Sequence, residues 1–446
     1  MSIAMQDETT TSQDEQSIEV EVSNDGMRAF IVLPAATAFL DEKSILYAIE
    51  EAGVTEGFER AAEQAADEER LAGRPMIVAL GQPVSEAAVE FSPLFDTERA
   101  FEPASFDNNL HLLQRYATVI AGEPLAHLFV TRPPRTGRNV RGEEVTPQRT
   151  ADEAIAACLG EGAAFDADRS QALATSNGYP YLDETGRVCV KSEFVIEGDI
   201  GLDCEHFGVF GNLTVNGNIR EKLIIEVTGN LTVNGDIDDV TVKVDGNAVI
   251  NGDILNCRTG GVHVSGDISF TSADNALVVC AGHIRFTEHA QFCKLIAGRG
   301  VYGDEQKSSL VGGLVQSGEH VEVAVIGNSG AIGTEIEITI SPYIKEKMLA
   351  LTKKLASLRE KPSDNAALID MLTEQLQNYE NQLEEHINET LLGSVTLPRH
   401  IIVFKKIFGG TYLRILKKSQ TVVDEMEKVS FSIADGELVA DSFKTD

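Results

Sequence analysis

Four aspartates recur at one position of a short repeated phrase, and carboxylates repeated in this way could do two kinds of chemistry. Each lies in a Gly-Asp-Ile sequence: Asp199, Asp236, Asp253 and Asp267. Stacked in a row, they could hold Ca²⁺ or act as acid and base on a polysaccharide. However, Asp is an ordinary corner residue, and no Lys or Arg recurs beside it. The chain also has no Trp and only 6% aromatic residues for stacking on sugars. We therefore expect no catalytic residues and no enzyme.

Histidine and cysteine side chains give no metal site by their spacing. His283, His289 and Cys293 form the closest grouping, and residues 6 and 4 positions apart need not converge in strands. The six cysteines include no CxxC pair and lie mostly in apolar surroundings, which predicts buried free thiols in a reducing compartment. No glycine-rich phosphate loop is present, and no Gly-x-Ser-x-Gly elbow follows a strand. We expect no metal and no cofactor.

An arginine-rich loop is the main candidate for binding. Residues 132–144 read Arg-Pro-Pro-Arg-Thr-Gly-Arg-Asn-Val-Arg-Gly-Glu-Glu. Guanidinium groups suit carboxylate or phosphate, so this loop could dock an acidic protein or an anionic ligand. The alternative is that the arginines pair with the protein's own carboxylates and pin the loop. The candidate partner-binding residues are Arg132, Arg135, Arg138 and Arg141.

The overall charge excludes two classes of partner. The chain has 70 acidic and 37 basic residues and a net charge of −33, which would repel nucleic acid and anionic lipid. No apolar run is long enough to span a bilayer. Residues 1–17 lack the basic and apolar regions of a signal peptide, and we expect them to be a disordered acidic tail. These features predict a cytoplasmic protein with no membrane insertion.

The elements that would position these residues are predicted by a short sequence motif that occurs four times. The copies begin at Gly211, Gly229, Gly246 and Gly260, which are 18, 17 and 14 residues apart. Inside each copy, apolar residues alternate as in a strand buried on one face, and an Asn-Gly or Ser-Gly pair then marks a corner where glycine can take positive φ. Asn-Gly also favours hairpins, but a meander would not repeat the same Asn and Gly in every copy. The period predicts a single-stranded, right-handed parallel β-helix.

The rest of the chain divides around this β-helix. Short strands and helices, including a hairpin over 18–33 and an Ala/Glu-rich helix over 59–71, predict an N-terminal α+β domain over 18–147. A transition segment follows over 148–193. The β-helix, with about seven to nine coils, occupies 194–341. The strands over 393–446 would extend or cap it, because an open end exposes unpaired backbone.

At Pro342 the apolar period changes to that of a heptad. Residues 342–361 carry six basic and two acidic residues, and residues 364–389 carry seven acidic and no basic ones. A short break at 361–364 separates the two segments. This pattern predicts an antiparallel coiled-coil hairpin over 342–392, with opposite charges fixing the pairing.

Several motifs together resemble one known family. They are the Gly-Asn-Leu-Thr-Val-Asn-Gly-Asp-Ile repeats, Ser309–Gly318, the run Val325–Ile336 leading into the hairpin, Gly409–Ile415, and the loop Gly137–Gly142. The chain resembles the flagellar assembly protein A family of bacteria. This resemblance implies a cytoplasmic motility-associated protein with an N-terminal domain and a β-helix, and it brings no catalytic residues. The coils also resemble the β-helical half of the bacterial septum-site inhibitor, where they are association surfaces.

We therefore predict a non-enzymatic scaffold or adaptor that docks protein partners of the flagellar machinery and forms a homo-oligomer. The alternative is a filament that grows through stacked β-helix ends. A third interpretation is a polysaccharide-acting β-helix enzyme.

Overall fold

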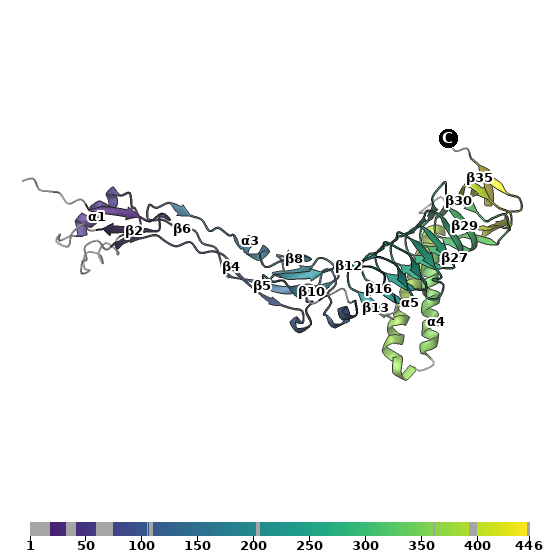
Figure 1. Ribbon diagram of the computed structural model, residues 1–446, viewed down its shortest axis with the longest axis horizontal. Helices are drawn as coiled ribbons and strands as arrows, with labels where there is room; N and C mark the ends of the chain where they lie inside the picture. The colour runs from purple at the N-terminus through teal and green to yellow at the C-terminus, as the bar shows by residue number, and fades with distance from the viewer. Residues whose placement is uncertain are drawn as a thin grey trace, which may run out of the picture.

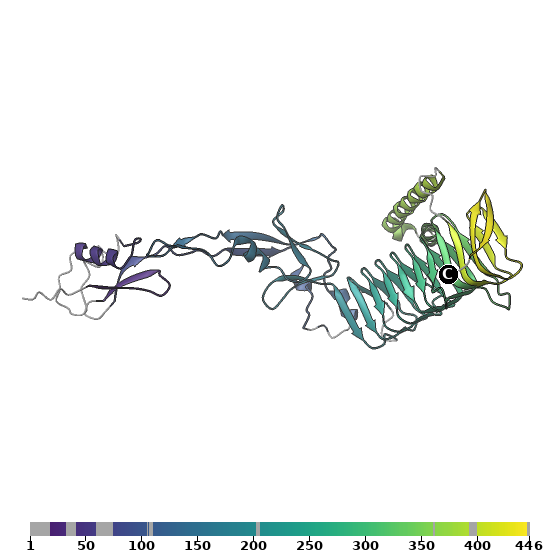
Figure 2. The same cartoon turned by 90° about the horizontal axis from the view of Figure 1, so that it is seen from above.

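The computed structural model describes residues 18–32, 42–58, 75–104, 106, 110–201, 206–359, 362–391 and 399–443. The chain is strongly elongated (Figures 1 and 2). Two small antiparallel units form its N-terminal part, a long β-solenoid follows, and a helical hairpin projects from the side of the solenoid. The predicted acidic tail over 1–17 and the predicted helix over 59–71 lie outside the described residues.

The first unit is a three-stranded antiparallel sheet with one helix. It contains β1 (Glu19–Val22), β2 (Arg28–Val32), β3 (Met76–Leu80) and α1 (Glu42–Glu51). The predicted hairpin forms here, with Gly26 at a φ of 67° in its turn. Ile31, Ile45, Ile49 and Val78 are buried in a small core of their own.

The second unit has a separate core, and it crosses the expected domain boundary. Its sheet has the order β4-β5-β9-β8, and its other elements are small. The bounds are β4 (Ala88–Pro93), η1 (Thr97–Arg99), η2 (Leu110–Arg115), β5 (Pro124–Arg132), α3 (Ala151–Ala156), β8 (Ala163–Asp166), β9 (Gln171–Ala174), β10 (Tyr179–Leu182) and β11 (Val188–Lys191). Two short strands, β6 (Gly137–Arg138) and β7 (Glu144–Val145), pair with each other in the segment that joins the two units. Because β5 pairs with β9, the sheet spans residue 147. Leu125, Ile155 and Val188 share one core, so residues 148–193 belong to a packed unit rather than to a transition segment.

The solenoid is built from coils with three faces. The first face contains β12 (Glu193–Glu197), β14 (Asn212–Asn216), β17 (Leu231–Val233), β20 (Ala248–Ile250), β23 (Ile268–Phe270), β26 (Ile284–Phe286), β28 (Val301–Gly303), β30 (His320–Ile326) and β32 (His400–Ile407). The short second face contains β15 (Ile219–Arg220), β18 (Ile237–Asp238), β21 (Asp253–Leu255) and β24 (Ser272–Asp274). The third contains β13 (His206–Val209), β16 (Ile224–Val227), β19 (Thr241–Val244), β22 (Val262–Val264), β25 (Leu277–Cys280), β27 (His289–Ala297), β29 (Ser309–Ser317), β31 (Thr334–Ile338) and β33 (Tyr412–Ile415).

Successive coils pair in parallel, which confirms the predicted parallel β-helix. On the first face, Leu213 pairs with Leu231 and Leu231 pairs with Ala248, each one coil further along. The inward side chains form columns that are fully buried, as at Leu231 and Ile284. Alternation of apolar residues therefore fills the interior, and each outward side chain lies above its equivalent in the preceding coil.

The fourth copy of the repeated sequence does not stack residue for residue on the third copy, as the sequence had predicted it would. Ile268 pairs with Ala248, while Ile254 pairs with Ala273. The reason is that each coil has two corners with similar sequences, and the fourth copy places Gly-Asp-Ile at the corner where earlier coils have Gly-Asn followed by an apolar residue. As a result, Asp267 lies outside the row formed by Asp236 and Asp253.

The corner glycines are needed for space rather than for positive φ. At the predicted Asn-Gly and Ser-Gly corners φ is not positive, and a Cβ would overlap the main chain of the preceding coil. These glycines are Gly217, Gly235, Gly252 and Gly266. Positive φ occurs instead at the corner between the second and third faces, at Asp239, Asn256 and Asn275, residue types that tolerate this conformation.

Both ends of the described solenoid are covered. At the N-terminal end, Phe101, Tyr116, Tyr179 and Phe194 pack edge to face, and Tyr179 Oη accepts a hydrogen bond from the Phe210 N–H at 3.1 Å. At the C-terminal end the pairing becomes antiparallel between β33 and β34, between β32 and β35, and between β35 and β36. The bounds are β34 (Lys418–Thr421), β35 (Met426–Ala434) and β36 (Glu437–Ser442).

The helical hairpin is inserted between β31 and β32. Its arms are α4 (Pro342–Leu358) and α5 (Pro362–Leu391), which lie side by side and project away from the coils (Figure 1). Leu355 and Leu372 are buried. The expectation that opposite charges join the two arms fails, because no ion pair links the described side chains of α4 and α5. Apolar packing therefore holds the hairpin together.

Candidate interaction surfaces

The arginine loop lies on an extended two-stranded neck between the two N-terminal units (Figure 1). Arg135 and Ser85 exchange two main-chain hydrogen bonds of 2.9 and 3.0 Å, and Arg138 and Gln82 do the same at 3.0 and 2.8 Å. These bonds fix the backbone from which the arginines project. The neck has no large core, so it presents its side chains to solvent.

The four candidate arginines do not form one cluster. Arg132 and Arg135 are exposed and line one groove of about 550 Å³ together with Ser85 and Pro133. Arg138 forms an ion pair with Glu56, with 2.7 Å between Nη1 and Oε1. Arg141 is exposed in the adjoining turn. The pinning interpretation thus holds for Arg138, whereas the side chains of Arg132, Arg135 and Arg141 make no ion pair with the described residues.

Three of the four repeated carboxylates, those of Asp199, Asp236 and Asp267, accept hydrogen bonds that join one coil to the next. Asp199 Oδ1 accepts the Asn218 N–H at 2.7 Å, and Asp236 Oδ1 accepts the Asp253 N–H at 2.9 Å. Asp267 Oδ1 accepts the His283 N–H at 2.8 Å in the neighbouring column. The hydrogen bonds from Asn218 hold the pKa of the Asp199 carboxyl below its usual range. These carboxylates satisfy corner amides, which is a structural role.

One column of outward side chains changes from amides to histidines along the solenoid. It runs through Asn212, Asn230, Asn247, Asp267, His283, Gly300, His320 and His400. At Gly300 the ring of Tyr302 occupies the position that a side chain would take, and its hydroxyl is hydrogen-bonded to His320 Nε2. His320 and His400 stack with ring centroids 5.0 Å apart and an angle of 7°.

Burial favours the uncharged form of the two histidines at the centre of this column, His283 and His320. Burial lowers the pKa of His283 and of His320, and the stacked His400 lowers that of His320 further. His400 Nε2 lies 3.0 Å from Glu322 Oε1, and this contact lowers the pKa of the Glu322 carboxyl. His320 Nδ1 is buried with no hydrogen-bond partner among the described atoms. The column is therefore most stable with His320 uncharged.

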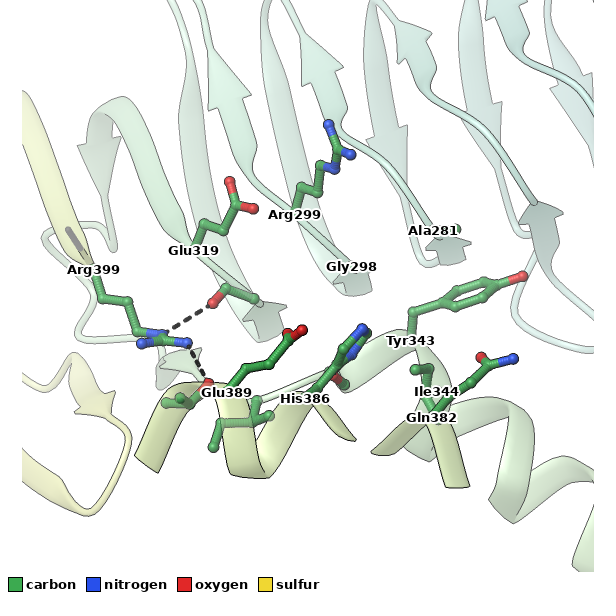
Figure 3. A pocket seen from close by; sticks show the side chains of 14 residues that line it. Ala281, Gly298, Arg299, Glu319, Tyr343, Ile344, Gln382, His386, Glu389 and Arg399 are labelled. Atoms are coloured by element: carbon green, nitrogen blue, oxygen red, sulfur yellow. Dashed lines mark hydrogen bonds between the residues drawn. The ribbon is translucent and has the colours of Figure 1, made fainter. Parts of the chain in front are cut away.

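A cavity of about 420 Å³ lies where the hairpin meets the solenoid (Figure 3). Gln382, His386 and Glu389 of α5 line it together with Tyr343 of α4, and Gly298 of the solenoid lies opposite them. Arg399 bridges the two parts, since its Nε donates to Gly318 O at 3.3 Å and its Nη2 donates to Thr390 Oγ1 at 3.5 Å.

Two further contacts fix the base of the hairpin. Ser341 Oγ and His386 Nδ1 are 2.6 Å apart, and Lys294 Nζ of β27 lies 2.9 Å from Glu346 Oε2 of α4. Sequence reasoning missed these residues, as it missed the cavity and the histidine column. No signal in a single sequence could have found them, because the contacts join positions far apart in the chain and depend on how the hairpin is set against the coils.

The grouped His and Cys residues of the sequence lie apart in the fold. His283, His289 and Cys293 do not meet, because His289 faces Asp274 at 3.4 Å and His283 lies in another column. Among the described residues, no group of His, Cys, Asp or Glu could hold a metal ion. The five described cysteines are free thiols, and burial raises the pKa of Cys280 to about 12. In the described part of the chain, no helix has the length and apolar character needed to cross a bilayer.

These features define the class of protein: a β-solenoid with a side hairpin and an extended N-terminal region of small antiparallel sheets. Two family models match the chain, the Flagellar Assembly Protein A β-solenoid domain over residues 192–438 and the Flagellar Assembly Protein A N-terminal region over residues 18–185. The chain therefore belongs to the flagellar assembly protein A family. No curated protein and no solved structure matches it.

Proposed function

We propose that this protein is a non-enzymatic, cytoplasmic scaffold that docks protein partners during flagellar assembly or placement. Membership of the flagellar assembly protein A family supports a role in flagellar assembly. The main observation in favour of a scaffold is that side-chain carboxylates and amides of the repeated polar residues form hydrogen bonds between successive coils. The regular part of the molecule is a stiff support, and binding falls to the parts that project from it.

The partner-binding surface in this proposal is the groove on the neck that Arg132 and Arg135 line. The guanidinium groups of both residues are exposed and without an ion pair to the described residues, in a chain of net charge −33. A partner with exposed carboxylates would gain charge-assisted hydrogen bonds there. Arg141 is exposed outside this groove, whereas Arg138 holds Glu56 and contributes mainly to the neck's own structure.

The two other interpretations have less support. A filament formed by stacked ends needs an open coil, but an aromatic cluster covers the first coil and antiparallel strands cover the last described one. A polysaccharide-acting enzyme needs free carboxylates facing substrate, but Asp199, Asp236 and Asp267 accept main-chain hydrogen bonds.

An affinity pull-down from motile cells tests the proposal. The intact chain is compared with the variant R132E/R135E and with the control R169E, which reverses an exposed arginine in the second unit. Captured proteins are identified by mass spectrometry. We expect flagellar proteins with the intact chain and the control, and at least a tenfold smaller yield with R132E/R135E. Equal yields with all three chains would disprove the arginine surface, and capture of no flagellar protein would disprove the scaffold.

A further inference from the structure

The two arms of the hairpin carry opposite charges, but their described side chains form no ion pairs with each other. On α4, Lys353 and Lys354 are exposed, and on α5, Asp370 and Glu374 are exposed. None of these four side chains makes an ion pair with a described residue. All four lie in the halves of their helices nearer the turn, away from the cavity at the base.

Each arm also exposes one large apolar side chain beside its charges. Leu349 of α4 is 47% exposed and Met371 of α5 is 49% exposed. Leu349 and Lys353 are four residues apart on one helix, and Met371 and Glu374 are three apart on the other, so each apolar residue shares a helix face with a charge. An apolar residue flanked by charge on an exposed helix face is typical of a helix-pairing surface.

The solenoid does not cover this part of the hairpin. The described contacts between the two lie at the base and along the first half of α4. They include Ile344, the Lys294–Glu346 ion pair and Arg399, and Lys347 and Ala350 of α4 line a groove together with Lys243 and His263 of the solenoid. Beyond the base, α4 and α5 project side by side into solvent (Figures 1 and 2). The exposed faces are therefore free to meet another molecule.

The charge pattern determines which molecule fits. A two-fold axis parallel to the helices exchanges the positions of the two arms, so that α4 of one copy faces α5 of the other. The basic arm then meets an acidic arm twice, once on each side of the axis. Any foreign partner would need the same two-sign pattern at the same spacing, whereas a second copy of this chain has it already.

We propose that the hairpin pairs with the hairpin of a second copy of this chain, forming a four-helix bundle in which Lys353 and Lys354 of each copy face the acidic arm of the other. The interface is isologous, and the apolar side chains of Leu349 and Met371 are buried in it. This inference makes the proposed scaffold a two-copy one, so that each assembly presents two arginine grooves.

Charge reversal with mixing tests the pairing on the purified full chain. The first variant is K353E/K354E and the second is D370K/E374K. Each variant alone places like charges opposite each other at both sides of the axis, so we expect the dimer Kd to rise at least about tenfold, since four exposed contacts change from attraction to repulsion. A 1:1 mixture of the two variants restores opposite charges on both sides and should form the dimer again.

The readout is molar mass by sedimentation velocity or light scattering. The intact chain should reach about twice 48.2 kDa, while each variant alone stays near 48.2 kDa. The control K307E/K417E, which makes the same change in net charge as K353E/K354E at exposed positions on the solenoid, should remain a dimer. Unchanged circular dichroism shows that the variants are folded.

Three results would overturn the inference: a monomeric intact chain, a variant that dimerises as well as the intact chain, or a mixture that stays monomeric. None of them bears on the pull-down with R132E/R135E, because the neck and the hairpin are separate surfaces. Conversely, loss of the dimer on charge reversal and its recovery on mixing would support the hairpin pairing even if no flagellar partner were captured.

Discussion

Replacing Gly246 with alanine tests the stacking of the coils at a single atom. Gly246 donates its N–H to Gly229 O at 3.0 Å, and a Cβ built on it would lie 2.6 Å from that oxygen and 2.5 Å from Asn230 Oδ1. The φ angle there is not positive, so backbone strain is not the cause. The added methyl group must separate two coils, which stretches this bond and the 2.8 Å bond from Asn247 N–H to Asn230 Oδ1.

The cost can be estimated from those contacts. Overpacking a close contact typically costs about 1–3 kcal/mol, and two weakened hydrogen bonds add about 1 kcal/mol. We therefore expect Gly246→Ala to lower the free energy of unfolding by about 2–4 kcal/mol, which corresponds to a Tm lower by about 4–16 °C for a domain of this size.

The assay is thermal unfolding followed by circular dichroism, with Gly333→Ala as the matched control. A Cβ at Gly333 would meet nothing within 4 Å, and its φ is not positive, so this change should leave Tm unaltered or slightly raised. If Gly246→Ala melts within about 1 °C of the intact chain, or if Gly333→Ala is equally destabilising, the reasoning about coil spacing is wrong.

Three further outcomes are expected. Because burial lowers the pKa of His320, the unfolded chain binds more protons than the folded one as the pH falls below about 6.5. The contribution of His320 to stability is therefore complete above about pH 6.5 and is lost below it; urea titrations of the intact chain should show this loss, and His320→Gln should reduce it. Tyr179→Phe removes the hydrogen bond that the Phe210 N–H donates and should cost about 1–3 kcal/mol in the same titrations, whereas an unchanged midpoint would contradict the importance of this cap. Burial raises the pKa of Cys257 to about 11 and of Cys280 to about 12, so neither thiol should react with iodoacetamide until the chain is unfolded, and peptide mass spectrometry would expose any modification of the native protein.

The solenoid could be predicted because its sequence repeats at the spacing of one coil. Alternation at Leu213 and Val215 indicated one buried face, and the recurring Asn favoured stacked coils over a meander. The structure joins these residues through the Asn212–Asn230–Asn247 hydrogen bonds. The phase of the fourth copy was mispredicted because both corners of a coil need a small residue and a side chain that accepts a hydrogen bond. A Gly-Asp-Ile phrase suits either corner.

The N-terminal units and the hairpin base could be predicted only in part. Local alternation of apolar residues predicted the hairpin β1–β2. However, β5 pairs with β9 across nearly forty residues, so a domain boundary placed at residue 147 divides one sheet. The four arginines were selected as candidate binding residues by their spacing. Their division into a groove at Arg132 and Arg135 and an ion pair at Arg138 depends on tertiary contacts with Ser85 and Glu56.

The central claim is that this chain works by holding other proteins and not by chemistry along its coils. The most direct test is the number of flagella per cell after cells lacking the chain are complemented with three versions of it. D236N/D253N removes two carboxylate charges but keeps an acceptor oxygen at position 236 for the Asp253 N–H, and it should restore flagella as well as the intact chain does. R132E/R135E should fail to restore them. Failure of folded D236N/D253N together with full restoration by R132E/R135E would contradict the claim.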